Sequence, residues 1–198
     1  KTMMSEARAG NSRYVHEVGE LGNPVVPSAK AAPPKIREAY EILAQRLKEP
    51  DDFKRLVAVE ALRRLTTRTM ATYRDHFRGL FDPMLSDPLP EVRWRAAWAL
   101  GRMKLSSDAL RGAAKDSDDR VAERAVWALG RARDDKAESA LLAALDRSPS
   151  IQRQAIAGLK RITGLKLGDD PQAWRDSARK AGVSPPEDKN DSGKDSQD

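Results

Sequence analysis

Residues 91–102 of this chain have the sequence EVRWRAAWALGR, and residues 120–131, which lie 29 positions later, have the sequence RVAERAVWALGR. A third copy, SIQRQAIAGLKR, occupies residues 150–161 after a further 30 positions. A more degenerate copy precedes them at a shift of 38 positions. Its residues and their counterparts are Ala58 and Ala96, Ala61 and Ala99, Leu62 and Leu100, and Leu65 and Met103. A period of about 30 residues predicts stacked helical units.

Each copy begins after a turn rich in aspartate, serine or proline, at residues 87–90, 116–119 and 146–150. Such side chains accept hydrogen bonds from the free N–H groups at a helix start. A second helix is expected between copies, at Ser107–Lys115 and Asp135–Leu145. Gly101 and Gly130 are expected near helix ends, in the left-handed conformation that closes a helix. The predicted fold is all-α, a short α-solenoid (superhelix) of about four to five antiparallel helix pairs.

The chain is expected to divide into three parts. Residues 1–34 are interpreted as an N-terminal arm with a linker rich in proline and alanine, and residues 35–182 as the solenoid. The first three helices of the solenoid are expected to begin near Lys35, Asp51 and Thr69. Residues 183–198 hold five acids and two lysines among polar residues and prolines. Such a tail cannot bury apolar surface, so it is expected to be disordered.

An aspartate-rich turn followed by Val-Arg-x-x-Ala-x-x-Ala-Leu-Gly-Arg resembles the HEAT-like repeats of the phycobilisome-lyase type, which are common in bacterial proteins. The resemblance covers residues 87–162 well and residues 35–86 loosely. It implies the solenoid and a binding surface, but it does not imply lyase activity, because most proteins with these repeats are not lyases. The segment ITGLKLGDDPQAW at 162–174 resembles a motif that closes bacterial HEAT arrays. We expect a last helix there, with Trp174 covering the open end of the stack.

A stripe of positions i, i+3 and i+7 lies beside the core positions of each clear copy. In the three copies it consists of Arg95, Trp98 and Arg102, then Arg124, Trp127 and Arg131, then Gln154, Ala157 and Arg161. Stacked units are expected to place these stripes side by side on the concave face. The result is a ladder of guanidinium groups with two indoles between them. The candidate partner-binding residues are Arg95, Trp98, Arg102, Arg124, Trp127, Arg131 and Arg161.

Two interpretations of this stripe stay open. In the first, the arginines bind carboxylates or phosphates of a partner, and the tryptophans contact a flat or apolar part of it. In the second, the arginines pair with acids of the chain itself, such as Glu91 and Glu123, and the indoles pack on arginine side chains in cation–π contacts. The second is favoured for the arginines, and the first for Trp98 and Trp127.

The composition gives no sign of catalytic chemistry. The 198 residues include no cysteine, which excludes disulfides, thiolate metal sites and cysteine nucleophiles. The two histidines, His16 and His76, have neither a serine partner nor a cluster that could hold zinc. The sequence also lacks a glycine-rich phosphate loop. We therefore expect a protein that is not an enzyme and that has no metal site and no cofactor.

The expected function is a non-catalytic protein–protein interaction or scaffold module, which binds an acidic partner segment on its concave face. A nucleic-acid-binding solenoid is the alternative, because the net charge is +6 and becomes +9 without the tail, which contributes −3. Chromophore handling of the lyase kind follows only from the family resemblance. No membrane span is expected, since no apolar run approaches about 18 residues. The protein is expected to be soluble, and cytoplasmic, or exported if Lys1 is a processed end.

Overall fold

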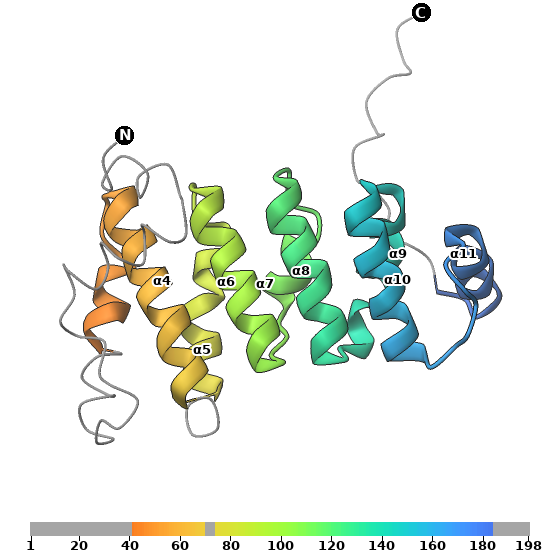
Figure 1. Ribbon diagram of the computed structural model, residues 1–198, viewed down its shortest axis with the longest axis horizontal. Helices are drawn as coiled ribbons and strands as arrows, with labels where there is room; N and C mark the ends of the chain where they lie inside the picture. The colour runs from red at the N-terminus through yellow and green to blue at the C-terminus, as the bar shows by residue number, and fades with distance from the viewer. Residues whose placement is uncertain (1–40, 70–73, 184–198) are drawn as a thin grey trace, which may run out of the picture.

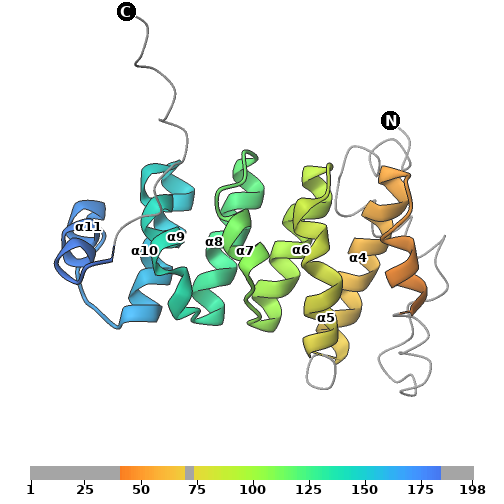
Figure 2. The ribbon, with the colours of Figure 1, turned by 180° about the vertical axis from the view of Figure 1, so that it is seen from behind.

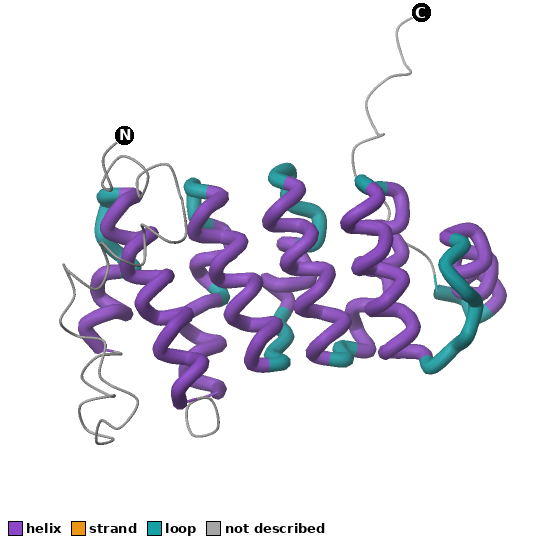
Figure 3. The backbone as a smooth tube through the Cα atoms, viewed as in Figure 1, coloured by secondary structure: helices purple, strands orange, loops and turns teal. Residues whose placement is uncertain are grey.

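The computed structural model of the protein describes residues 41–69 and 74–183. These residues form helices joined by short loops and contain no strand (Figure 3). The predicted all-α class is therefore confirmed. The expected arm at 1–34 and the expected tail, apart from Val183, lie outside the described residues.

Four helices lie side by side in one layer of the molecule (Figure 1). They are α4 (Asp52–Thr69), α6 (Pro90–Met103), α8 (Asp119–Ala132) and α10 (Pro149–Thr163). The second layer, visible from behind in Figure 2, contains α5 (Arg74–Phe81), η1 (Pro83–Ser86), α7 (Asp108–Ala113), η2 (Asp135–Ala137), α9 (Glu138–Ala143) and η3 (Ala144–Asp146). The α-helices of the second layer pack on the long helix that follows each of them, α5 on α6, α7 on α8 and α9 on α10. This is the predicted solenoid of antiparallel helix pairs.

The start of α4 agrees with the sequence prediction, but its end does not. The helix continues to Thr69, where a new helix was expected to begin, and α5 starts at Arg74. Residues 70–73, between the two helices, lie outside the described residues. Phe77 and Phe81 are fully buried, and their ring centroids lie 6.4 Å apart. The α5 segment therefore contributes an aromatic pair to the core.

The predicted capping turn forms at the start of α8, whereas Leu89 and Ser148, the N-cap residues of α6 and α10, make no side-chain capping hydrogen bond. The Asp118 side chain accepts hydrogen bonds from the backbone N–H groups of Arg120 and Val121 at the start of α8. The Ser107 hydroxyl accepts from the backbone N–H of Leu110 at the start of α7. These bonds satisfy donors that a helix start leaves without a partner. The aspartate and serine in these turns thus fix where α7 and α8 begin.

The two repeat glycines have a different role from the one predicted for them. The residues in the left-handed conformation at the ends of α6 and α8 are Lys104, with φ of 54°, and Arg133, with φ of 55°. Gly101 and Gly130 lie inside these helices and are buried. A Cβ atom at Gly101 would lie 2.4 Å from the Trp127 ring, which is closer than Cβ contacts occur. Glycine is therefore needed there for close packing of helices, not for the helix end.

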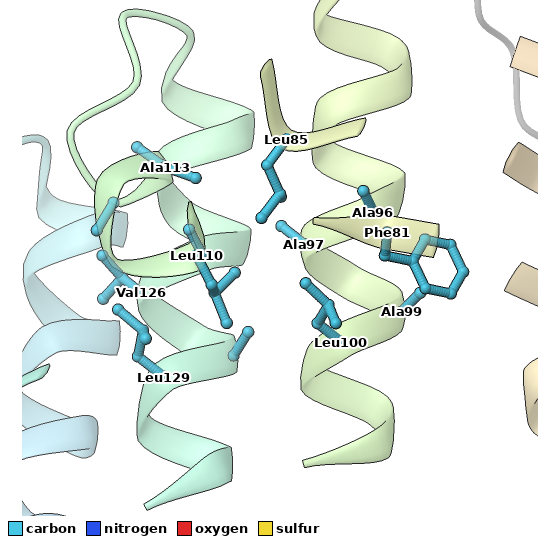
Figure 4. Packing of buried hydrophobic residues seen from close by; sticks show 14 of the residues in the cluster. Phe81, Leu85, Ala96, Ala97, Ala99, Leu100, Leu110, Ala113, Val126 and Leu129 are labelled. Carbon is cyan, nitrogen blue, oxygen red and sulfur yellow. The ribbon is translucent and has the colours of Figure 1, made fainter. Parts of the chain in front are cut away.

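A second close approach occurs between α8 and α10. A Cβ at Gly130 would lie 2.6 Å from the Cα of Gly158. The small residues of the repeat positions are also fully buried, namely Ala96, Ala99, Ala125, Ala128 and Ala155. Larger side chains from the second layer complete the core, as Figure 4 shows for Leu110 of α7 and Phe81 of α5. One continuous core extends through the described part of the solenoid.

The C-terminal end of the array is closed by α11 (Pro171–Lys180), as the sequence predicted. The Asp170 side chain caps this helix by accepting a hydrogen bond from the backbone N–H of Gln172. Trp174 is buried in the common core, and its Nε1–H donates to the carbonyl oxygen of Gly168 at 3.2 Å. The indole therefore serves as a core residue that covers the end of the stack.

Candidate partner-binding face

Arg95 lies in a different place from the one the sequence predicted. Its side chain is fully buried between α4 and α6, where its Nε donates to Glu60 Oε2 at 3.2 Å and its Nη1 donates to the Glu91 carbonyl at 2.8 Å. Burial lowers the pKa of this guanidinium from its ordinary value, and the charge of Glu60 opposes that effect. Arg95 therefore cannot offer its guanidinium to a partner on the surface. The carboxylate of Glu91, its expected partner, binds Arg120 at 2.8 Å instead.

Trp98 lies between two arginines on the surface shared by α4 and α6. The guanidinium carbon of Arg63 is 4.5 Å from the centroid of the Trp98 ring, and that of Arg102 is 5.6 Å from it. Both distances are within the range of cation–π attraction. Arg102 is exposed and forms no ion pair with a carboxylate of the described residues. The indole thus holds an available cation in place.

Trp127 occupies the equivalent position in the next unit. Its ring packs on Gly101 of the preceding helix, and the Arg131 guanidinium lies 5.2 Å from the ring centroid. Arg131 also reaches back to α6, where its Nε donates to the Gly101 carbonyl at 3.2 Å. That oxygen belongs to the last turn of α6, where a cation is favoured by the partial negative charge of the helix end. Arg131 is therefore held beside the residue that precedes Arg102.

The unit formed by α10 has Ala157 where the earlier units have tryptophan. Arg161 is exposed, and its Nη1 donates to the Ala157 carbonyl at 3.3 Å. The same nitrogen lies 3.7 Å from the position that a Cβ at Gly130 would take. Arg161 thus reaches back to α8 much as Arg131 reaches back to α6. Arg124, half-buried on α8, forms no ion pair with a carboxylate of the described residues.

These observations define a surface that we call the arginine face. It consists of Arg102, Arg124, Arg131 and Arg161, together with the indoles of Trp98 and Trp127. Six of the seven predicted residues are at least partly exposed, and the seventh, Arg95, is fully buried. Of the acids expected to neutralise it, Glu123 accepts a hydrogen bond from the Ser150 hydroxyl at 3.1 Å. Neither prediction about Trp98 and Trp127 excludes the other, because the indoles are half-exposed and also stack on arginines.

A comparison with protein families agrees with this repeated arrangement. A family model of HEAT repeats matches residues 40–122 and again residues 77–160, which together cover more than half of the chain. The chain belongs to the HEAT-repeat family. HEAT repeats commonly mediate protein–protein interactions, and the family is generally non-catalytic. A search of curated proteins finds no match.

The HEAT units carry a second set of arginines, which sequence reasoning missed. Arg55 in α4 and Arg93 in α6 occupy aligned positions, 38 residues apart. Arg55 forms two hydrogen bonds to Asp87, at 2.7 and 3.2 Å, and Arg93 forms two to Asp116, at 2.7 and 2.9 Å. Each of these aspartates belongs to the turn of the next unit. The alignment of the two arginines, followed by the aspartates, is the signal that could have revealed this pairing.

Arg55 and Arg93 also form hydrogen bonds to the turn that precedes their own helix. Arg55 donates to the backbone carbonyls of residues 49 and 50, and Arg93 donates to those of residues 87 and 88. The hydrogen bond to Asp116 raises the pKa of Arg93. In the third and fourth units the aligned residues are Ala122 and Gln152, and Gln152 donates to the Leu145 carbonyl. These arginines are structural and are not available to a partner.

The described residues were also searched for a metal-binding site and for a membrane-spanning helix. Within residues 41–69 and 74–183, no group of three or more histidine or acidic side chains could hold a metal ion. Among the helices of the same residues, none has both the length and the apolar composition that a membrane crossing requires. The arginine face is thus the surface on which a functional argument can be built.

Proposed function

We propose that this HEAT-repeat protein is a non-catalytic interaction module that binds an acidic segment of a partner protein on its arginine face. One observation carries the proposal. The arginine face has cations without an ion pair to the described carboxylates, whereas most other described arginines of the long helices and turns have one. The paired arginines are Arg55, Arg63, Arg93, Arg95, Arg111, Arg120, Arg147, Arg175 and Arg179.

The chemistry of the face favours an anionic ligand. A guanidinium group can form two parallel hydrogen bonds to a carboxylate, and its position on an indole reduces the freedom that binding would remove. Glu60, the acid of α4 at its contact with α6, is already bound by Arg63 and Arg95. No acid of the described stripe positions therefore competes for Arg102 or Arg131. An acidic partner segment would gain these hydrogen bonds without displacing an existing ion pair.

A protein partner is favoured over a nucleic acid by the surroundings of the face. Arg147 and Arg175 are bound to Asp119 and Asp146, so these two arginines do not extend the arginine face into a wider basic surface. Strong nucleic-acid binding usually depends on several phosphate contacts spread over a wide basic surface. The arginine face is narrow by comparison. Nucleic acid remains the alternative outcome of the test.

The proposal is tested by capturing partners from a nuclease-treated lysate. The three proteins compared are the wild type, the triple variant Arg102→Gln/Arg131→Gln/Arg161→Gln, and the control Arg179→Gln. Arg179 is an exposed arginine on α11, away from the arginine face, so its change tests for nonspecific charge effects. Each captured protein is then divided into overlapping peptides to map the bound segment.

We expect a partner whose bound segment is acidic, and we expect the triple variant but not the control to lose it. Equal capture by the wild type and the triple variant would show that another surface binds the partner. Recovery of nucleic acid alone, with affinity that falls steeply as salt rises, would support the nucleic-acid alternative.

A further inference from the structure

We infer that the ligand of the arginine face is an acidic peptide in the extended polyproline II conformation, with a carboxylate at every third residue. The peptide crosses α6, α8 and α10, so that successive carboxylates bind Arg102, Arg131 and Arg161. This inference rests on the proposed function and deepens it, because it specifies the conformation and the spacing of the bound segment.

The three arginines form one row across successive helices. They occupy the same position in their repeats, at intervals of 29 and 30 residues. Arg131 is bonded to the carbonyl of Gly101, the residue next to Arg102. Arg161 in turn lies against Gly130, the residue next to Arg131. Each guanidinium is therefore directed toward the helix that carries the preceding one.

The row starts at α6 and not at α4. Arg64 occupies the aligned position in α4, at a shift of 38 from Arg102, but it is engaged in other interactions of the chain. The unit of α4 also has Glu60 where the next two units have tryptophan. The binding row is thus limited to three arginines.

The spacing of the row follows from helix packing. Neighbouring helix axes lie about 8–10 Å apart, with the shortest distances where small residues meet. Glycines at 101 and 130 leave no room for a Cβ atom, so these helices pack closely. Three residues of a polyproline II chain span roughly 9 Å and complete one turn, so its side chains at i, i+3 and i+6 point the same way, whereas those of a β-strand alternate between two faces. Carboxylates at i, i+3 and i+6 therefore match the row, whereas neighbouring carboxylates do not.

An extended peptide fits the face better than a helix does. The guanidinium groups of Arg131 and Arg161 lie close to the surface, since both donate to backbone carbonyls of the helices. A polyproline II chain is thin enough to approach them, whereas a helix is about 10–12 Å wide. A helix would also need about fifteen residues to present acids at i, i+7 and i+14 along the row. A seven-residue extended segment is sufficient.

The experiment uses three fluorescent peptides with equal numbers of glutamates. The first has the sequence EAPEAPE, the second has the same composition with its glutamates adjacent, and the third is a fifteen-residue helical peptide with glutamates at i, i+7 and i+14. Fluorescence anisotropy measures the dissociation constant of each for the full chain in dilute and physiological salt. The variants are Arg102→Gln, Arg131→Gln, Arg161→Gln and the control Arg179→Gln, with circular dichroism to verify folding.

We expect EAPEAPE to bind about tenfold more tightly than the other two peptides, and each arginine change on the face to weaken it about five- to tenfold. The Arg179→Gln control should bind as the wild type does. Replacing one glutamate of EAPEAPE by glutamine should have less effect when its arginine has already been changed. That coupling would assign each carboxylate to one arginine.

Two other outcomes are distinguishable. If the adjacent-glutamate or helical peptide binds as tightly and depends on the same arginines, the acidic-ligand function stands and the three-residue spacing is wrong. If none of the peptides depends on Arg102, Arg131 or Arg161 in folded variants, both the spacing and the proposed function are wrong.

Discussion

Glycine at position 101 determines how closely two HEAT units approach, and its replacement gives the first prediction. The Cβ of Gly101→Ala would lie 2.4 Å from the Trp127 ring and 2.7 Å from the Cβ of Ala128. Because the helices must separate or the indole must move, we expect the free energy of unfolding to fall by about 1–3 kcal/mol. Urea denaturation followed by circular dichroism measures it.

Gly112 provides the matched control for this prediction. It also lies in a helix, α7, but it is exposed, and a Cβ added there would have no neighbouring atom within 4 Å. Gly112→Ala should therefore leave stability unchanged or raise it by up to about 1 kcal/mol, because alanine has the higher helix propensity. Similar losses for the two substitutions would indicate that close packing is not the function of Gly101.

Asp118 links the stability of α8 to pH. Its pKa is lowered, first by the hydrogen bond from Arg120 and also by the backbone N–H of Val121. A carboxyl with a lowered folded-state pKa contributes its full stabilisation above its unfolded value, about 4, and loses it as pH falls through the folded value. Asp118→Asn keeps a helix-capping side chain without the charge.

We expect Asp118→Asn to lower the free energy of unfolding at pH 6 by about 0.5–1 kcal/mol. The difference between variant and wild type should shrink as pH falls from 5 toward 3, because the wild-type carboxyl then becomes neutral too. Denaturation curves at pH 6, 4 and 3 test this. A difference that is constant with pH would mean that the charge of Asp118 does not stabilise α8.

The sequence predicted most of the candidate face but not the place of Arg95. The helical spacing of the repeat determines which positions share a stripe, and this put Arg102, Arg131 and Arg161 on one surface. The burial of Arg95 depends on Glu60, which belongs to a unit whose spacing differs from the others. A pairing between units of unequal length requires their three-dimensional register, which the repeat pattern alone does not contain.

The contact between α4 and α6 contains buried charged side chains, in contrast to the contacts of α6 with α8 and of α8 with α10. It contains the buried Glu60, bound by Arg63 and Arg95, and two indoles that stack on arginines. The contacts of α6 with α8 and of α8 with α10 instead have buried glycine and alanine at their closest approach, and the ion pair between α6 and α8, Arg120–Glu91, lies at the surface. The first contact thus depends on charge balance in a buried environment.

That charge balance leads to a prediction for Glu60. Glu60→Ala would leave Arg95 buried without its carboxylate, and we expect a loss of about 3–5 kcal/mol in the free energy of unfolding. In the double variant Glu60→Ala/Arg95→Met both charges are absent, so part of the loss should be recovered. Chemical denaturation of the two single variants and the double variant measures the coupling. A double variant no more stable than Glu60→Ala would argue against the ion pair.

The boundaries of the long helices were easier to predict than the form of the second layer. Capping residues such as Asp118 and Asp170 mark a helix start directly in the sequence. Residues 135–145 were expected to form one helix, but they form η2, α9 and η3. Apolar spacing at i+3 does not distinguish these, because i+3 neighbours lie on one side in both α- and 3₁₀-helices.

The molecule as a whole is a stack in which each HEAT unit packs mainly on its neighbours. A repeat period in the sequence is enough to predict such an architecture. The binding surface is harder to predict, because arginines occur at several positions of each unit. Arg93 is committed to Asp116 in the next turn, whereas Arg102 has no ion pair among the described residues. A structural arginine such as Arg93 can therefore be told from an available one such as Arg102 only by the ion pairs between units.

An array of this kind needs a closed end, and Trp174 provides the last prediction. The indole is buried against the core at the end where α11 packs on α10. Trp174→Ala should lower the free energy of unfolding by about 3–5 kcal/mol, because it leaves a large cavity over the last unit. Terminal units with a polar outer face keep solenoids from associating, so this variant should also self-associate.

Urea denaturation and size-exclusion chromatography at several concentrations test both effects. Trp174→Phe is the control, since it retains most of the apolar volume and loses only the hydrogen bond to Gly168, worth about 1 kcal/mol. The phenylalanine variant should therefore stay monomeric wherever the wild type is monomeric. If Trp174→Ala were as stable as Trp174→Phe and did not associate, α11 would be an appendage of the array and its core would end at α10.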